Sequence, residues 1–179
     1  MSTYVALLRG INVGGKNRLA MRDLVAMLEA SACVDVRTYI QSGNVVFKAP
    51  TRVADGLAAR LEQRIARDTG LKVPVVLRSA AELAQVPRKN PFLAAGADPE
   101  HLYVSFLADV PAARAAAALD PERSPGDAYR LIGRDIYMHL PHGAGQSKLT
   151  NAYFDSKLAT ISTGRNWRTV LKLIEMVQA

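Results

Sequence analysis

A glycine-rich segment near the start of the chain has the residue types that bind phosphate groups. Gly10–Asn17 (GINVGGKN) fits most of the pattern G-x-x-x-x-G-K-[ST], in which backbone N–H groups and a lysine surround the phosphates. The eighth position holds Asn17, where a hydroxyl should bind magnesium. The helical periodicity also begins later, near Ala20, and the neighbouring strands are predicted to be antiparallel. We therefore do not predict nucleotide hydrolysis.

Two interpretations of this loop stay open. In one, the loop binds an anion with the help of Arg9, Lys16 and Arg18. In the other, it is a tight connection between a strand and a helix, whose glycines are needed for positive φ. The candidate ligand-binding residues of this segment are Arg9, Gly10, Asn12, Gly14, Gly15, Lys16 and Asn17.

Two further segments are rich in small and polar residues. Gln41-Ser42-Gly43-Asn44 offers neutral donors and acceptors and is typical of a hairpin turn. Gly145–Asn151 (GQSKLTN) places Ser147 beside Lys148. A Ser–Lys nucleophile needs a spatial geometry that adjacency in sequence does not provide, so we do not predict one.

The last polar segment, Thr163–Arg168 (TGRNWR), leads into the final predicted helix. Thr163 or Asn166 is expected to cap that helix, and Trp167 is expected to join the core. Arg165 is the functional candidate of the segment, because a helix N-terminus beside an arginine attracts anions.

The formal net charge of +7 is concentrated at the two ends of the sequence. Residues 1–48 and residues 146–179 each carry a net charge of +3, and the middle of the chain carries +1. If the two ends meet in space, they form a positive surface that attracts nucleotides, nucleic acid or acidic partners. A charge of this size also suffices merely to keep a small protein soluble.

The composition excludes several classes of protein. With 179 residues, 49% of them hydrophobic, the chain can bury a core without disulfides or metals. Its one cysteine, Cys33, follows a predicted helix and is expected to be a buried, inert thiol. His139 and His142 lack nearby Cys or acidic ligands, and His101 is expected to be an ordinary residue, so no metal site is predicted. We expect a cytoplasmic protein, because neither a signal peptide nor an apolar run long enough to cross a bilayer is recognisable.

The first half of the chain has the order β-α-β-β-α-β, which predicts a ferredoxin-like sheet with strands one and three in the middle. Pro74 places the fourth strand at an edge. The expected strands are Thr3–Arg9, Asp35–Gln41, Asn44–Lys48 and Lys72–Arg78, and the expected helices begin near Ala20 and span Leu57–Ile65, with Gly70 as a C-terminal cap.

The second half is predicted to be a smaller α/β part. Its expected elements are a strand at His101–Leu107, a helix from Pro111, a hairpin of Tyr129–Ile132 with Ile136–Leu140, a helix at Ala152–Leu158 and a last helix with Trp167, Val170, Leu171 and Ile174 on one face. Turn signals around Asn90–Phe92 and Gly96–Pro99 place the boundary between domains 1–97 and 98–179. The first strand is apolar on both faces, so we expect the second half to cover it and the chain to fold as one compact α+β unit.

Several of these segments together resemble one protein family. The chain is similar, over nearly its whole length and in the right order, to the bacterial domain-of-unknown-function family numbered sixteen ninety-seven. The segments that carry the resemblance are LLRGINVGGKN (7–17), TYIQSGNVVF (38–47), NPF (90–92), GQSKLTN (145–151) and TGRNW (163–167). The resemblance implies an α/β fold with a ferredoxin-like portion and no assigned activity. Where the family typically has proline-asparagine-glycine, this chain has Pro141-His142-Gly143.

The sequence therefore predicts a protein that binds a phosphate-bearing ligand, either a nucleotide or nucleic acid. The alternatives are an enzyme that acts on a small anionic substrate in the same pocket and an interaction module for an acidic partner. No cofactor, membrane partner, catalytic residue or oligomeric state is predicted. The full set of candidate ligand-binding residues is Arg9, Gly10, Asn12, Gly14, Gly15, Lys16, Asn17, Gln41, Ser42, Gly43, Asn44, Ser147, Lys148, Arg165, Asn166 and Trp167.

Overall fold

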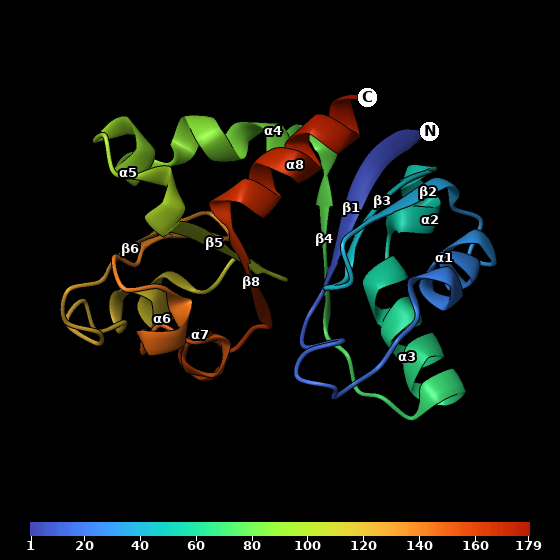
Figure 1. Cartoon of the computed structure of the whole chain (residues 1–179), viewed down its shortest axis with the longest axis horizontal. Coiled ribbons are helices and arrows are strands. Elements are labelled where there is room, and N and C mark those ends of the chain that lie inside the picture. Colours follow the sequence, from blue (N-terminus) through green and yellow to red (C-terminus); the bar gives the residue numbers. More distant parts are fainter. The chain divides into compact units, whose positions relative to one another are not determined.

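The computed structural model describes all 179 residues, and these form two four-stranded antiparallel sheets with their helices (Figure 1). In chain order the elements are β1 (Ser2–Leu8), α1 (Met21–Glu29), β2 (Val34–Tyr39), β3 (Asn44–Ala49), α2 (Thr51–Ala54), α3 (Leu57–Thr69), β4 (Val75–Ser79), α4 (Ala80–Lys89), α5 (Pro91–Ala94), η1 (Pro99–His101), β5 (Leu102–Leu107), α6 (Ala113–Ala117), β6 (Ala128–Ile132), β7 (Asp135–His139), η2 (Ala144–Gln146), α7 (Asn151–Leu158), β8 (Ser162–Asn166) and α8 (Trp167–Gln178).

The contacts between residues divide the chain into two compact units, which we describe separately. Unit 1 comprises Met1–Leu83 and Leu173–Ala179, and unit 2 comprises Ala84–Lys172. The domains 1–97 and 98–179 stay a prediction.

Unit 1 has the predicted ferredoxin-like topology. Its strands lie in the order β2-β3-β1-β4, and every neighbouring pair is antiparallel, so strands one and three occupy the middle. Pro74 immediately precedes the edge strand β4, and its carbonyl accepts the Arg9 N–H at 3.0 Å. The α+β fold class is thus confirmed for this half of the chain.

Two helices cover one face of the sheet of unit 1 (Figure 1). Leu24 and Leu28 of α1 and Leu61 and Ile65 of α3 are buried in a core with the alternate residues of β1 and β3. Helix α3 ends as predicted at Gly70, which takes the left-handed conformation of a C-terminal cap. The period of about 3.6 residues therefore identified both helices correctly from the sequence.

The glycine-rich loop of unit 1 is a tight turn. The Lys16 N–H donates to the Val13 carbonyl at 3.0 Å, and Gly14 and Gly15 have φ of 57° and 73°. Two successive positive φ angles define a type I′ turn, which glycine forms without steric cost. These glycines thus provide the positive φ angles of a tight connection between strand and helix. The helix begins only at Met21, as the late start of the helical periodicity indicated.

Asparagine side chains hold this loop against the β2–β3 turn. Asn12 Nδ2 donates to the carbonyls of Leu19 at 2.9 Å and Gln41 at 2.7 Å, and Asn12 Oδ1 accepts the Leu19 N–H at 2.9 Å. Asn17 Nδ2 donates to the Gly10 carbonyl at 3.0 Å. These bonds join two segments that are remote in sequence, so Asn12 fixes the position of the loop.

The β2–β3 turn is equally tight. Asn44 is fully buried, and its Nδ2 donates to Ser42 Oγ at 2.9 Å. A Cβ on Gly43 would lie 2.7 Å from Leu8 Cβ, and Gly43 has φ +84°. Gly43 therefore stands where no side chain fits.

Unit 2 repeats the topology of unit 1. Its order along the chain is β5-α6-β6-β7-α7-β8, and its strands lie in the order β6-β7-β5-β8, again all antiparallel. Strand β8 was not predicted, because its sequence STGRN has weak strand propensity. Pairing with β5 overrides that propensity.

Two details of the predicted helices in the second half were wrong. Helix α6 begins at Ala113 with Ala112 as its N-cap, so Pro111 precedes the helix instead of starting it. In α8 the side chain of Leu171 is 47% exposed, and the buried face runs through Trp167, Val170 and Leu173. Asn166 caps α8 as expected, because its Oδ1 accepts the Thr169 N–H at 2.9 Å.

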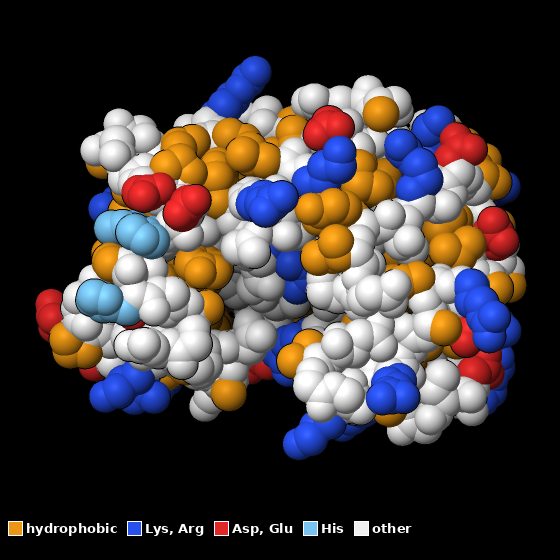
Figure 2. All heavy atoms as spheres, viewed as in Figure 1, with side chains coloured by type: hydrophobic (Ala, Val, Ile, Leu, Met, Phe, Trp, Pro, Cys, Tyr) orange, Lys and Arg blue, Asp and Glu red, His pale blue; other side chains and the backbone are white.

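None of the helices is both long and apolar enough to span a bilayer. On the face drawn in Figure 2, Lys and Arg side chains are interspersed with acidic and uncharged ones and do not gather in a single patch.

We expect Gly43→Ala to destabilise the protein strongly. The new Cβ would collide with Leu8, and an alanine at φ +84° is itself strained. The free energy of unfolding, measured with urea, should fall by roughly 2–3 kcal/mol. Gly14→Ala is the control, because its φ is +57° but nothing lies within 4 Å of its Cβ, so it should lose only about 1 kcal/mol. Equal losses in both variants would contradict the steric argument.

We expect Asn12→Ala to loosen the glycine-rich loop. Three hydrogen bonds disappear and leave Leu19 with unsatisfied backbone groups, so the free energy of unfolding should fall by about 2 kcal/mol or more. Lys16→Ala, in the same exposed loop, should change it by no more than about 0.5 kcal/mol. An Asn12→Ala protein as stable as the parent would show that these bonds do not hold the loop.

Candidate functional site

The predicted site residues fall into two groups, one in each unit. Unit 1 contains those from the loop at 9–17 and the turn at 41–44, and unit 2 contains Ser147, Lys148, Arg165, Asn166 and Trp167. In unit 1 the Asn12–Gln41 hydrogen bond brings the two segments together. Within that group Lys16, Asn17 and Gln41 are exposed, whereas Gly43 and Asn44 are buried.

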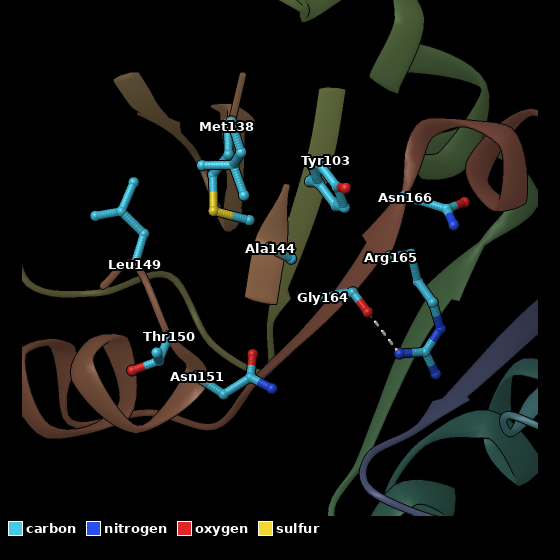
Figure 3. A pocket seen from close by; sticks show the side chains of 10 residues that line it. Tyr103, Met138, Ala144, Leu149, Thr150, Asn151, Gly164, Arg165 and Asn166 are labelled. Carbon is cyan, nitrogen blue, oxygen red and sulfur yellow. Dashed lines mark hydrogen bonds between the residues drawn. The ribbon is translucent and has the colours of Figure 1, made fainter. Parts of the chain in front are cut away.

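In unit 2 a pocket of about 380 Å³ lies over the sheet beside β5 and β8 (Figure 3). Ten residues line it: Tyr103, Met138, Leu140, Ala144, Leu149, Thr150, Asn151, Gly164, Arg165 and Asn166. The register of the sheet brings several of them together, because Tyr103 pairs with both Met138 and Asn166. Paired residues of antiparallel strands point to the same face, so these three side chains project toward the side that α7 covers.

The polar groups at the rim of the pocket are mainly hydrogen-bond donors. Asn166 Oδ1 already accepts the Thr169 N–H, so its amide Nδ2 is the end left for other contacts. Thr150 Oγ1 accepts the Tyr153 N–H at 3.2 Å as the N-cap of α7, so its hydroxyl hydrogen is left to donate. The lining contains no carboxylate. A rim of this kind complements a ligand rich in acceptor oxygens.

A glycine opens the floor of the pocket. Gly164 lies in the middle of β8, has no positive φ, and would carry a Cβ whose nearest neighbour is Asn151 Oδ1 at 4.0 Å. The backbone therefore does not require glycine here. Glycine inside a strand often marks a place where another group approaches the backbone closely.

The sequence analysis expected Arg165 to attract an anion beside the N-terminus of the last helix, but the structure shows other contacts for its side chain. Its guanidinium turns away from Tyr103, and its Nη1 donates to the Gly164 carbonyl at 2.8 Å (Figure 3). The same Nη1 also donates to Thr163 Oγ1 at 2.8 Å. Burial lowers the pKa of Arg165 to about 10, so it stays protonated at neutral pH. Its charge lies beneath the strand that carries Gly164.

The GQSKLTN segment leads into the pocket. Ser147 Oγ accepts the Leu149 N–H at 3.1 Å, and the Lys148 N–H donates to Ser124 Oγ at 3.0 Å, so both residues are part of a fixed turn. Lys148 is exposed and directly precedes the lining residues Leu149 and Thr150 in the sequence. Trp167 is buried and belongs to the core, as predicted.

Sequence reasoning missed most of the pocket lining. Met138, Leu140 and Leu149 look like core residues in the sequence, and Tyr103 lies in an apolar strand. The one signal available was Gly164, an isolated glycine between polar residues of what proved to be a strand.

Metal binding and thiol chemistry were the other kinds of site considered for the His, Cys, Asp and Glu side chains. No group of three or more His, Cys, Asp and Glu side chains is arranged to hold a metal ion. Cys33 is buried, and burial raises the pKa of its thiol despite the opposing charge of Arg60. This agrees with the inert thiol expected from the sequence.

Comparisons with known proteins give the fold and the family. The structure of a conserved bacterial protein from Streptococcus pneumoniae is similar, with a TM-score of 0.74 at 20% sequence identity, over 100% of this chain and 99% of that chain. At this identity the similarity establishes the fold alone. No curated protein sequence matches the chain. The family model described as "Protein of unknown function (DUF1697)" matches residues 1–137. Since this is most of its length, the chain belongs to that family.

Proposed function

We propose that this protein binds a small phosphate-bearing ligand in the pocket of unit 2. The observation that carries the proposal is the donor-rich rim over an open glycine floor. Asn166 and Thr150 line the pocket and have their oxygens engaged in helix caps, so the groups that they have left for a ligand are N–H and O–H donors. Phosphate oxygens are acceptors only, and they match such a rim.

The charges near the pocket support the same ligand class. No carboxylate lines the pocket, the exposed Lys148 directly precedes two lining residues in the sequence, and the Arg165 guanidinium donates to the Gly164 carbonyl. The N-terminus of α7 begins at Asn151, another lining residue, and adds the positive end of a helix dipole. Each of these features favours an anion over a cation or a neutral molecule.

The size and the lining favour binding of a small molecule. A volume of 380 Å³ lies at the lower end of the usual range for ligand pockets, which is roughly 300–1,000 Å³. Apart from Arg165, the only titratable side chain of the lining is Tyr103. The lining therefore offers recognition groups rather than an acid–base pair, which supports a binding role over the enzyme alternative.

Filling the glycine floor should abolish binding. We expect Gly164→Val to remove measurable affinity for AMP and ribose 5-phosphate in calorimetry. The backbone at this position accepts a side chain, but the valine side chain would occupy the space that the ligand needs. Lys148→Ala should weaken AMP binding about tenfold, as expected for a lost charge-assisted contact. Gly145→Val is the matched control, since Gly145 also lacks positive φ, has open space around it and does not line the pocket. Binding of neither probe by the parent protein would refute the proposal.

A second candidate function rests on the basic loop of unit 1 that precedes α1, residues 9–20. This segment holds Arg9, Lys16 and Arg18 and no acidic residue, and Lys16 and Arg18 are exposed. Asn12 and the type I′ turn keep the loop in one conformation. Such a loop suits the phosphate backbone of nucleic acid, which is bound through charge rather than sequence.

The salt dependence of binding tests this second candidate. If the loop contacts the backbone, single-stranded oligothymidylate should bind, and Lys16→Ala and Arg18→Ala should each reduce the slope of log K against log salt by roughly 0.7. Lys72→Ala, an exposed lysine outside the loop, and Gly164→Val should leave the slope unchanged. Equal effects of Lys72→Ala and Lys16→Ala would show that only overall charge matters.

A further inference from the structure

The pocket of unit 2 has two ends of different chemistry. Its inner wall is made by Met138, Leu140 and Leu149, which are all buried and apolar. Its mouth is formed by Thr150 and Asn166, which are exposed and whose N–H and O–H groups are left to donate. A ligand that fills the pocket therefore needs an apolar end that goes in and a polar end that stays at the mouth.

The floor is suited to a flat group. Gly164 exposes bare backbone, and it lies diagonally across from Tyr103, because Tyr103 pairs with Asn166, the residue two positions further along β8. A planar ring can lie on the glycine backbone beside the tyrosine ring. An aliphatic chain would leave this flat space partly unfilled.

One polar group borders the place of such a ring. Asn151 Oδ1 lies 4.0 Å from the Cβ position of Gly164, so the carboxamide of Asn151 borders the floor. Asn151 Oδ1 accepts the Ser162 hydroxyl at 3.4 Å, so the Nδ2 group of Asn151 is left to donate to an acceptor on the edge of a nucleobase.

We infer that the pocket takes the base of a mononucleotide, with the base inside against Met138 and Leu149 and the phosphate at the mouth toward Lys148. This inference rests on the proposed function and adds the ligand class and its orientation. The base is held by the glycine floor, Tyr103 and Asn151, and the phosphate meets the donors of the rim. The small volume admits one nucleotide and not a strand.

Three ligands test the apolar end and the polar end of the pocket separately. The full-length protein should bind AMP, should bind adenosine within about tenfold of AMP, and should bind ribose 5-phosphate at least about tenfold more weakly than AMP, all measured by calorimetry. Ribose 5-phosphate binding as tightly as AMP, or adenosine failing where AMP binds, would overturn the inference and leave the proposed function intact. Binding of none of the three would refute both.

An asparagine variant tests the orientation independently. Asn151→Ala should weaken adenosine binding about tenfold and leave ribose 5-phosphate binding unchanged, because only the base meets the carboxamide. Gln146→Ala is the matched control, since this exposed amide lies near the pocket in sequence but does not line it. Thermal unfolding of each variant checks that the fold is kept. Equal losses for adenosine and ribose 5-phosphate in Asn151→Ala would overturn the assigned orientation.

Discussion

The pairing register of β5 with β8 is the constraint on which the candidate site depends. Tyr103 pairs with Asn166 and Ser105 pairs with Gly164, so a tyrosine, an asparagine, a serine and a glycine share one face of the sheet. A slip of one residue would turn Gly164 to the opposite face and bring Arg165 into its place. The open floor and the donor-rich rim both follow from this register, and neither is visible in the sequence until the strand is known.

The fold was largely predictable because periodic patterns of apolar residues decide it. Leu24 and Leu28, like Leu61 and Ile65, recur at helical spacing, and the structure places both pairs in one core. Strand β8 could not be predicted, since only its partner β5 makes the sequence STGRN a strand. Leu171 was assigned to the wrong face of α8 because the helical period alone does not say which neighbouring stripe the tertiary contacts will bury.

The site was predictable in part, and the limits have physical causes. The segments GQSKLTN and TGRNW were singled out for their polar residues, and both do border the pocket through Leu149–Asn151 and Gly164–Asn166. Arg165 was chosen for its charge, yet strand alternation turns its guanidinium to the other side. The apolar wall was missed because a methionine or leucine that lines a pocket has the same pattern as one that fills a core.

The two units share a topology, and comparing them shows what is particular to the second. In unit 1 Tyr4 pairs with Ser79, and Ala6 pairs with Leu77. The equivalent pairs in unit 2 are Tyr103 with Asn166 and Ser105 with Gly164. Ser79 and Asn166 each cap the helix that follows their strand, which supports the equivalence. Leu77 packs against the core of unit 1 where unit 2 has a glycine over a pocket. The same framework thus supports either a filled core or an open floor, and at this position the first unit has a leucine and the second a glycine.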